Sequence, residues 1–382
     1  MSLNGTWMQT VAQAWLVYRL TESSFMLGVV AFCNLAPVLL FSLFGGVIAD
    51  RIPRQQLLIG AQTAAMVQAL VLAVLTLLQW ITPGYIIMLA LFLGVVHAFE
   101  MPARHALLAQ LVPRENLPNA IALNSSAFNS ARFIGPAVAG WLVTLYGEGV
   151  VFLINACSFL AVLAGLVAMR LPVTTEEHSG SAHERLLEGL RFAWNQLHVR
   201  AGLIIISVTS LVSASMTVLM PVFAREIFHA DARVLGYLLS AIGIGALMGA
   251  LRLALRTTAD GIDRLIGLAS ITSGVSMIGF SLVDTYWLAM PVLVLAGFSH
   301  TTTAASVNTL IQLLVPDRLR GRVMALFSMI FIGLMPVGSL LAGAFGESLG
   351  VRATITGAGL LCLAGAAAFL VLVPRLEVFD QQ

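Results

Sequence analysis

The sequence has few charged residues and contains no lysine. Of its 382 residues, 10% are charged and 59% are apolar, whereas soluble domains typically carry about 25% charged and about 45–50% apolar residues. So few charges cannot solvate the surface of a chain of this length, which excludes a soluble enzyme and a nucleic-acid-binding protein. The class that remains is a polytopic membrane protein.

The missing lysine and the scarce cysteines exclude further chemistry. A G-x-x-x-x-G-K-[ST] nucleotide loop needs a lysine, so this polypeptide alone cannot be an ATP-driven pump. Cys33, Cys157 and Cys362 lie far apart in apolar stretches, which predicts neither a disulfide framework nor a metal site. We therefore expect no cofactor, no metal and no catalytic residue, and an ion or substrate gradient as the energy source. The N-terminal stretch lacks the basic flank and small-residue cleavage pattern of a signal peptide.

Long uncharged stretches predict twelve membrane-spanning helices, because one crossing needs about 20 largely uncharged residues. The stretch 55–99 is divided at Pro83-Gly84, and 116–147 is one helix interrupted by Arg132. The first span is rich in polar residues and has no basic leader, so we expect its start to be truncated by about one to three helical turns. The stretches cover residues 1–18, 23–49, 55–99, 116–147, 149–169, 201–224, 234–251, 265–283, 285–316, 323–346 and 353–374.

The arginines between these spans are distributed asymmetrically. With the loops placed alternately on two sides, 15 arginines fall on one side and four, Arg19, Arg225, Arg233 and Arg352, on the other. The positive-inside bias then places both termini in the cytoplasm. The arginine-rich run 317–322 is interpreted as a cytoplasmic loop that fixes this topology.

A hydrophilic stretch at 171–200 divides the chain into six plus six spans. Thr174 to Ser181 is a polar linker, and the residues after it alternate at helical period, which favours an amphipathic helix on the membrane surface. The predicted domains are an N-terminal bundle at 1–170, this linker and helix at 171–200, and a C-terminal bundle with a short tail at 201–382.

An internal repeat supports the division. A shift of 203 residues aligns 94–147 with 297–350 without a gap and gives 14 identities in 54 positions, which include glycines and a Leu-Val-Pro turn. The two halves therefore have the same topology. Parallel repeats of this kind are typical of transporters whose halves rock about a site near the membrane midplane.

The turn after the second span reads GGVIADRIPRQQ and resembles the loop signature of the major facilitator superfamily. Gly46, Asp50, Arg51 and Arg54 match that signature, with Gln55 and Gln56 in place of further basic residues. A small residue permits close helix approach, and Asp beside Arg can form a charge-assisted latch. The resemblance implies a cytoplasmic gating motif in an all-α fold of two pseudo-symmetric six-helix bundles.

The fifth span is similar to the antiporter signature of the same superfamily. Gly135-Pro136 and Gly140 match, while Ala122 and Ala131 replace the first two glycines. The stretches MPARHALLAQLVPRENLPNAIALNSSAFNSARFIGPAVAGWL and NTLIQLLVPDRLRGRVMALFS resemble the branch of the enterobactin exporter and related transmembrane secretion proteins. This resemblance implies efflux of a small molecule by antiport.

Two charged residues fall inside spans, where ionisable groups are by default candidates for a substrate or ion pathway. Arg132 could bind an anionic substrate or poise a carboxylate; the alternative is a structural charge that locks helices. Glu100 is its natural partner and could couple proton flow to transport. The alternative partner of Glu100 is Arg104, one turn away, which would make Glu100 an interfacial residue.

Other polar residues in the spans are candidates for substrate contact or proton coupling. His97 and His300 occupy matching positions of the repeat, and imidazoles titrate near neutral pH; the family resemblance implies that their helices line the central cavity. Gln9 and Gln13 of the first span are added to this set. The competing interpretation is that such groups only hold helices together.

The sequence thus predicts a secondary transporter of the inner (plasma) membrane that exports a siderophore or an amphipathic drug by proton antiport. Its expected partners are the substrate, protons and the lipid bilayer, without nucleic acid or ATP, and the expected state is a monomer. The alternative is proton-coupled uptake on the same fold. A receptor without transport or a membrane-embedded enzyme is a remote alternative, because the chain has neither a soluble signalling domain nor clustered catalytic groups.

Overall fold

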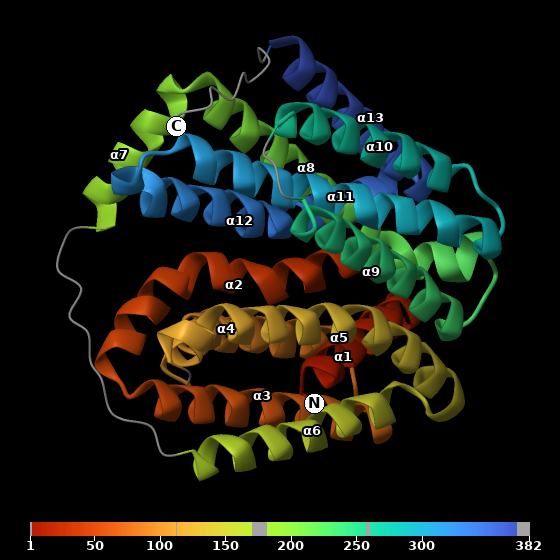
Figure 1. Ribbon diagram of the computed structural model, residues 1–382. Helices are drawn as coiled ribbons and strands as arrows, with labels where there is room; N and C mark the ends of the chain where they lie inside the picture. Colours follow the sequence, from red (N-terminus) through yellow and green to blue (C-terminus); the bar gives the residue numbers. More distant parts are fainter. Residues whose placement is uncertain (1, 112, 170–181, 257–259, 373–382) are drawn as a thin grey trace. The chain divides into compact units, whose positions relative to one another are not determined.

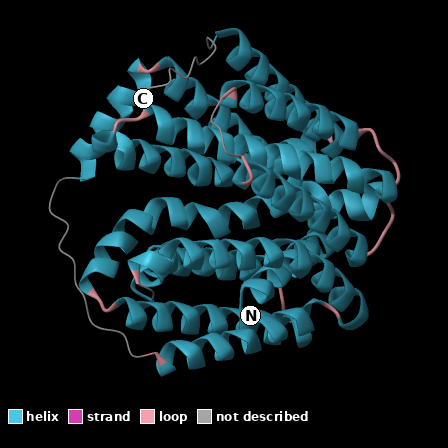
Figure 2. Cartoon of the chain, viewed as in Figure 1, coloured by secondary structure: helices cyan, strands magenta, loops and turns pink. Residues whose placement is uncertain are grey.

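The computed structural model describes residues 2–111, 113–169, 182–256 and 260–372, and every regular element within them is a helix (Figures 1 and 2). Twelve α-helices have 20 to 33 residues, and one, α7, has 14. At about 1.5 Å per residue, 20 residues reach about 30 Å, the thickness of the hydrocarbon layer. The α-helices are α1 Ser2–Thr21, α2 Ser24–Arg51, α3 Arg54–Leu77, α4 Pro83–Leu111, α5 Leu117–Tyr146, α6 Glu148–Ala168, α7 Ala182–Asn195, α8 Leu197–Val222, α9 Ala232–Ala254, α10 Ile262–Ser281, α11 Tyr286–Leu314, α12 Asp317–Leu349 and α13 Val351–Leu372; a 3-10 turn, η1, covers Arg114–Asn116 and a π-helical turn, η2, covers Phe223–Ile227.

Within the described residues, ten of the long helices are both long and apolar enough to cross a membrane. The other two are α1 and α5, which carry Gln9, Gln13 and Arg132 of the residues singled out above. The predicted division of 55–99 is confirmed, because α3 ends at Leu77 and α4 begins at Pro83. Proline suits that first position, since it has no N–H to leave unbonded and its backbone angle is already helical.

The chain forms two compact units. Unit 1 comprises Met1–His178 and Met220–Ser240, and unit 2 comprises Ser179–Leu219 and Ala241–Gln382. In unit 1, α2 packs on α4, α3 on α4 and α6, and α1 on α5 and α6. In unit 2, α10 packs on α11 and α13, and α12 on α7 and α13 (Figure 1). The domain boundaries at 170 and 200 stay a prediction, and the linker 174–181 lies outside the described residues.

Glycines of the repeat occupy equivalent close contacts in both units. A Cβ on Gly94 of α4 would lie 2.7 Å from the backbone oxygen of Asn34 on α2, and a Cβ on Gly297 of α11 would lie 2.2 Å from that of Ile242 on α9. A Cβ on Gly135 of α5 would likewise lie 2.7 Å from Trp7 Cβ on α1. A Cβ on its repeat mate, Gly338 of α12, would lie 2.5 Å from the Leu211 backbone oxygen of α8. Small residues thus let the same helix pairs approach in each half.

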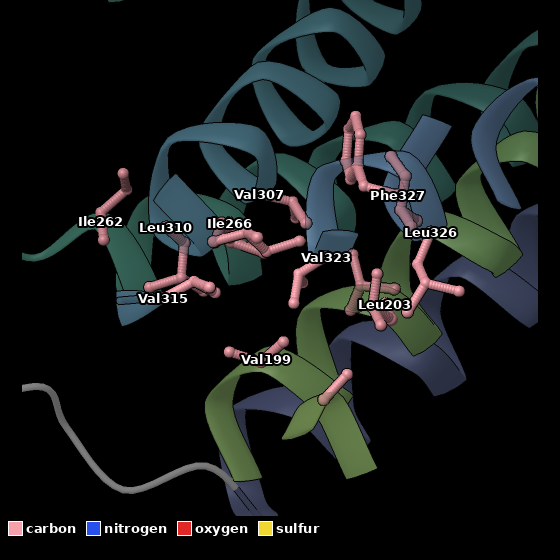
Figure 3. Packing of buried hydrophobic residues seen from close by; sticks show 14 of the residues in the cluster. Val199, Leu203, Ile262, Ile266, Val307, Leu310, Val315, Val323, Leu326 and Phe327 are labelled. Atoms are coloured by element: carbon pink, nitrogen blue, oxygen red, sulfur yellow. The ribbon is translucent and has the colours of Figure 1, made fainter. Parts of the chain in front are cut away.

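The interior of unit 2 is an apolar cluster to which α8, α10, α11 and α12 contribute (Figure 3). Val199, Ile266, Val307 and Val323 are fully buried in it. Because lipid tails are as apolar as these side chains, their contribution is tight van der Waals packing rather than removal from water.

The run 317–322, predicted as a loop, is helical, because α12 begins at Asp317. Pro316 precedes it and Asp317 lies in its first turn, where a negative charge is favourable. Arg318 and Arg322 form ion pairs with Glu188 of α7. On α7, Leu190 and Trp194 are exposed while Gly189 lies against Arg322, as expected for an amphipathic surface helix.

Candidate functional site

Among the acidic side chains of unit 1 that the structure describes, Glu100 is the most deeply buried, with 4% of its surface exposed. It lies on α4, and the Gln62 amide of α3 donates a hydrogen bond of 2.7 Å to its Oε1. Arg104, four residues further along α4, forms an ion pair with the same oxygen. His97 Nε2 lies 3.8 Å from the other oxygen, Oε2. Glu100 is therefore the centre of a buried cluster of titratable and polar groups.

These contacts decide between the two predicted partners of Glu100. Its cation is Arg104, and Arg132 is not among its contacts. The side chain of Arg104 is 42% exposed and that of Glu100 only 5%, so the pair joins the interior of the unit to its surface. Glu100 is thus a buried residue with an exposed partner, and the interfacial position that this alternative implies stays a prediction.

Arg132 lies in the middle of α5 and is half-buried. Among the described residues, no hydrogen bond or ion pair holds its guanidinium group. Pro136, four residues further on, has no N–H to donate to the Arg132 carbonyl oxygen, so the backbone is also less bonded there. A charge within a membrane helix is costly without a partner. The position suits a binding site in which the ligand supplies the negative group that pairs with Arg132.

The ring of Phe128, one turn before Arg132 on α5, is paired with a second aromatic ring. Trp7 of α1 meets the Phe128 ring edge-on with centroids 5.9 Å apart. The side chains from Leu123 to Phe128 are all exposed, including Asn124 and Ser125. Exposed polar side chains on a membrane helix favour a water-accessible surface over lipid. Trp7, Phe128 and Arg132 together can bind an amphipathic molecule that carries a negative group.

Gln9 and Gln13, predicted to contact substrate or protons, lie inside unit 1 at 3% and 4% exposure. Gln9 donates to Gln68 of α3 over 3.0 Å and accepts from Asn155 of α6 over 2.7 Å. Gln9 therefore links three helices, which supports the competing packing interpretation for this residue. The Gln13 amide nitrogen has no partner among the described residues.

The two histidines of the repeat differ in their surroundings. His97 faces Glu100, whereas His300 is half-buried on α11. The position that corresponds to Glu100 in the second half is Thr303, whose hydroxyl lies 3.4 Å from that of Ser270 on α10. The carboxylate cluster is thus present in one half alone.

The predicted gating motif lies at the junction of α2 and α3. The side chains of Gly46, Asp50 and Arg51 lie outside the described residues, so the proposed latch stays a prediction. Arg54 begins α3 and has an interaction partner.

The predicted Gly135, Pro136 and Gly140 motif is a packing surface of α5. Gly140 approaches the Ala232 backbone oxygen so closely that a Cβ would lie 2.5 Å from it, and a Cβ on Gly236 of α9 would lie 2.4 Å from the Pro136 oxygen. The Ser240 hydroxyl adds a hydrogen bond of 2.6 Å to the Phe133 oxygen. The motif therefore joins α5 to α1 and to the 232–240 segment within unit 1.

A second polar cluster, which the sequence did not reveal, lies at the C-terminal end of α1. Tyr18 donates a hydrogen bond to Glu226 of η2, and Arg225 forms a 2.9 Å ion pair with Glu22. Arg225 also lies over the Tyr18 ring, 5.8 Å from its centroid. The partners are more than 200 residues apart in sequence, so only the fold brings them together. Gln62 was missed for the same reason; its one signal was an amide within a predicted span.

Comparison with known proteins gives consistent matches over nearly the whole chain. The model of the transmembrane secretion effector family matches residues 1–382. The staphyloferrin A transporter of Staphylococcus aureus is 27% identical over 94% of this chain and 91% of its own length. The multidrug efflux pump Tap of Mycolicibacterium fortuitum is 26% identical over 98% and 94%.

Solved structures agree at the level of the fold. The nucleoside transporter NupG superposes with a TM-score of 0.73 at 15% identity, covering 97% of this chain and 95% of that chain. A bacterial homologue of the lysosomal transporter Spinster, in an inward-facing conformation, gives a TM-score of 0.77 at 12% identity over 98% and 95%. With the twelve long helices and the repeated glycine contacts, these matches show a multi-pass membrane transporter that moves a small molecule. The chain belongs to the transmembrane secretion effector family of the major facilitator superfamily.

Proposed function

We propose that this protein exports an amphipathic small molecule with an acidic group from the cytoplasm by proton antiport. The observation that carries the proposal is the unpartnered guanidinium of Arg132 beside the Trp7–Phe128 ring pair. The fixed positive charge favours an anionic group on the ligand, and the nearby aromatic rings favour a ligand that is partly apolar. Among the two substrate classes that the sequence predicts, this favours a siderophore, which chelates iron through oxygen anions, over a cationic drug.

Glu100 supplies the proton site of the proposal. A carboxylate that couples proton flow to transport needs surroundings that suit both its ionised and its protonated form. When ionised it accepts hydrogen bonds from Gln62 and Arg104. When protonated it becomes a donor, and the Gln62 amide oxygen, which has no hydrogen-bond partner among the described residues, can accept from it once the amide turns. The Gln62 amide can therefore hydrogen-bond Glu100 in either protonation state, as a donor to the carboxylate or as an acceptor from the carboxylic acid.

The contacts at the end of α1 support alternating access. Residues 220–240 belong to the predicted C-terminal bundle, yet they pack within unit 1. There Arg225 forms an ion pair with Glu22, and Glu226 accepts a hydrogen bond from Tyr18. By the arginine distribution this end faces outward. Opening of the transporter to the outside then requires these contacts to break. In this proposal the protein lies in the plasma membrane with both termini in the cytoplasm. Because both halves of the repeat lie in one chain, a monomer can complete the cycle.

The proposal is tested with the full-length protein in vesicles that carry an imposed pH gradient and a panel of labelled siderophores and drugs. Arg132→Ala should abolish accumulation of acidic substrates while the protein level in the vesicles stays the same. Met335→Ala, the repeat mate of that position, should transport normally. Accumulation by the wild type without proton exchange would refute antiport, and wild-type transport by Arg132→Ala would refute the substrate site. Uptake against the proposed direction would favour the alternative, proton-coupled import.

A further inference from the structure

A cavity of about 450 Å³ lies in unit 2 where α9 ends and α10 begins. Three arginines line it: Arg252 in the last turn of α9, Arg256 just beyond, and Arg264 in the first turn of α10. Gly261, Leu268 and Thr302 form further parts of its wall, and none of the lining residues is acidic. The transport site in unit 1 uses none of these residues.

Three like charges around one cavity repel one another. Arg252 is held over the Phe298 ring of α11 at 5.6 Å, a contact that leaves its charge uncompensated. Within the described residues, neither Arg252 nor Arg264 forms an ion pair, and both are exposed. Asp260 accepts a bond from Arg256 through its backbone oxygen, and Asp263 is buried on α10 outside the lining. An anion is the missing counterpart.

We propose that this cavity binds a phosphate group, presented by the headgroup of an anionic phospholipid. Guanidinium groups match phosphate oxygens in a bidentate geometry. The backbone N–H groups in the first turn of α10, which follows the left-handed Gly261, favour the same charge. The proposal does not rest on the transport mechanism.

The surroundings of the cavity favour a lipid over free phosphate as the source of that group. Leu268 lines the cavity and is 61% exposed, while Leu251 and Leu255 on the adjoining surface of α9 are 57% and 73% exposed. A ring of cations next to exposed leucines suits a headgroup with its acyl chains alongside. The arginine distribution places this end in the cytoplasmic leaflet, where anionic lipids attract basic pockets between membrane helices.

The test measures lipid binding to the purified full-length protein by native mass spectrometry and by thermal unfolding. The probes are phosphatidylglycerol, phosphatidylcholine with the same acyl chains, and inorganic phosphate. The variant Arg252→Gln/Arg264→Gln removes two exposed charges from the cavity. The control Arg233→Gln/Arg352→Gln removes two arginines from the opposite predicted side and changes the net charge equally. Arg264→Gln alone is the milder variant should the double variant unfold.

Wild-type and control protein should bind phosphatidylglycerol at least about tenfold more tightly than phosphatidylcholine. The Arg252→Gln/Arg264→Gln variant should lose this preference, and Arg264→Gln should lose part of it. If inorganic phosphate stabilises the wild type as well as the lipid does, and the variant abolishes both effects, the phosphate site holds but its source is the free ion. Equal binding of both lipids by the wild type, or an unchanged preference in the variant, overturns the proposal.

Discussion

The two halves of the chain share their backbone contacts and differ in their buried charges. Gly94 and Gly297 make equivalent close approaches, each against the helix two before its own among the membrane-spanning helices. At the same offset of 203 residues, Glu100 corresponds to Thr303, Arg104 to Val307 and Arg132 to Met335. The repeat therefore preserves the helix packing, while the charged residues Glu100, Arg104 and Arg132 of the first half have uncharged counterparts in the second.

The contact between α3 and α4 and its counterpart between α10 and α11 show the difference at one place. In the first half, the Gln62 amide bonds the Glu100 carboxylate at 2.7 Å; in the second half, the Ser270 and Thr303 hydroxyls lie 3.4 Å apart. Both pairs lie between equivalent helices, but only the first contains an ionisable carboxyl group. The comparison teaches that the repeat preserves the helix contacts without preserving the charged pair, so that under the proposed function one copy of the pair would serve transport.

The largest effect should follow from neutralising that carboxylate. Glu100→Gln keeps the size of the side chain and its hydrogen bonding, but it can neither gain nor lose a proton. Transport driven by a pH gradient should fall to the level of empty vesicles, whereas exchange of labelled for unlabelled substrate without a gradient should persist. The matched change in the second half, Thr303→Val, should leave both rates within about twofold, because it removes only a long hydroxyl contact with Ser270 and a hydrogen bond to the Ser299 oxygen of its own helix.

The pair of assays separates coupling from folding. Loss of exchange together with gradient-driven transport in Glu100→Gln would mean that Glu100 supports the structure or binds substrate. Full gradient-driven transport in the same variant would show that the proton site lies elsewhere in the protein. A defect of equal size in Thr303→Val would contradict the division of roles between the halves.

Glycine substitutions should have a smaller effect that is equal in both halves. In Gly94→Ala and Gly297→Ala the new Cβ would lie 2.7 and 2.2 Å from a backbone oxygen, so two helices must separate. We expect each to lower the free energy of unfolding by about 1–3 kcal/mol, measured by thermal unfolding in detergent. Gly60→Ala and Gly357→Ala, with no atom within 4 Å of the new Cβ, should leave it unchanged or raise it by up to about 1 kcal/mol. A loss confined to one half would contradict the equivalence of the contacts.

The sequence was sufficient to predict the helices, their number and the repeat. Those features depend on one-dimensional signals: uncharged runs of about 20 residues, a break at Pro83-Gly84, and glycines at a constant offset. The start of α12 was missed, because a run with four charges in six residues, 317–322, favours a loop on hydropathy alone. Its helical form is supported by ion pairs with Glu188 on α7, which no local pattern reveals.

The candidate site was predictable in its charged members but not in their partners. Glu100 and Arg132 stand out because few charges occur within spans. Whether the two meet depends on which way each helix faces, and helices that are apolar on nearly every side carry little amphipathic signal to fix that rotation. For the same reason Gln62 was not recognised as the partner of Glu100, and Gln9 was assigned to the pathway although it lies in the interior.

The smallest effect is expected for replacement of Gln9, which distinguishes a role in helix packing from a role in transport. Gln9→Leu leaves the Gln68 oxygen and the Asn155 amide without their buried partner. Hydrogen bonds between membrane helices contribute on average about 0.6 and at most about 1.7 kcal/mol, so we expect a loss of that size in the free energy of unfolding and an unchanged transport rate per folded molecule. In the second half, Ser299→Ala removes a hydroxyl that is equally buried but bonds to Leu295 of its own helix, and it should cost almost nothing. A transport defect in Gln9→Leu at normal stability would return Gln9 to the substrate or proton pathway, and it would extend the functional part of the first half from α4 and α5 into the centre of α1.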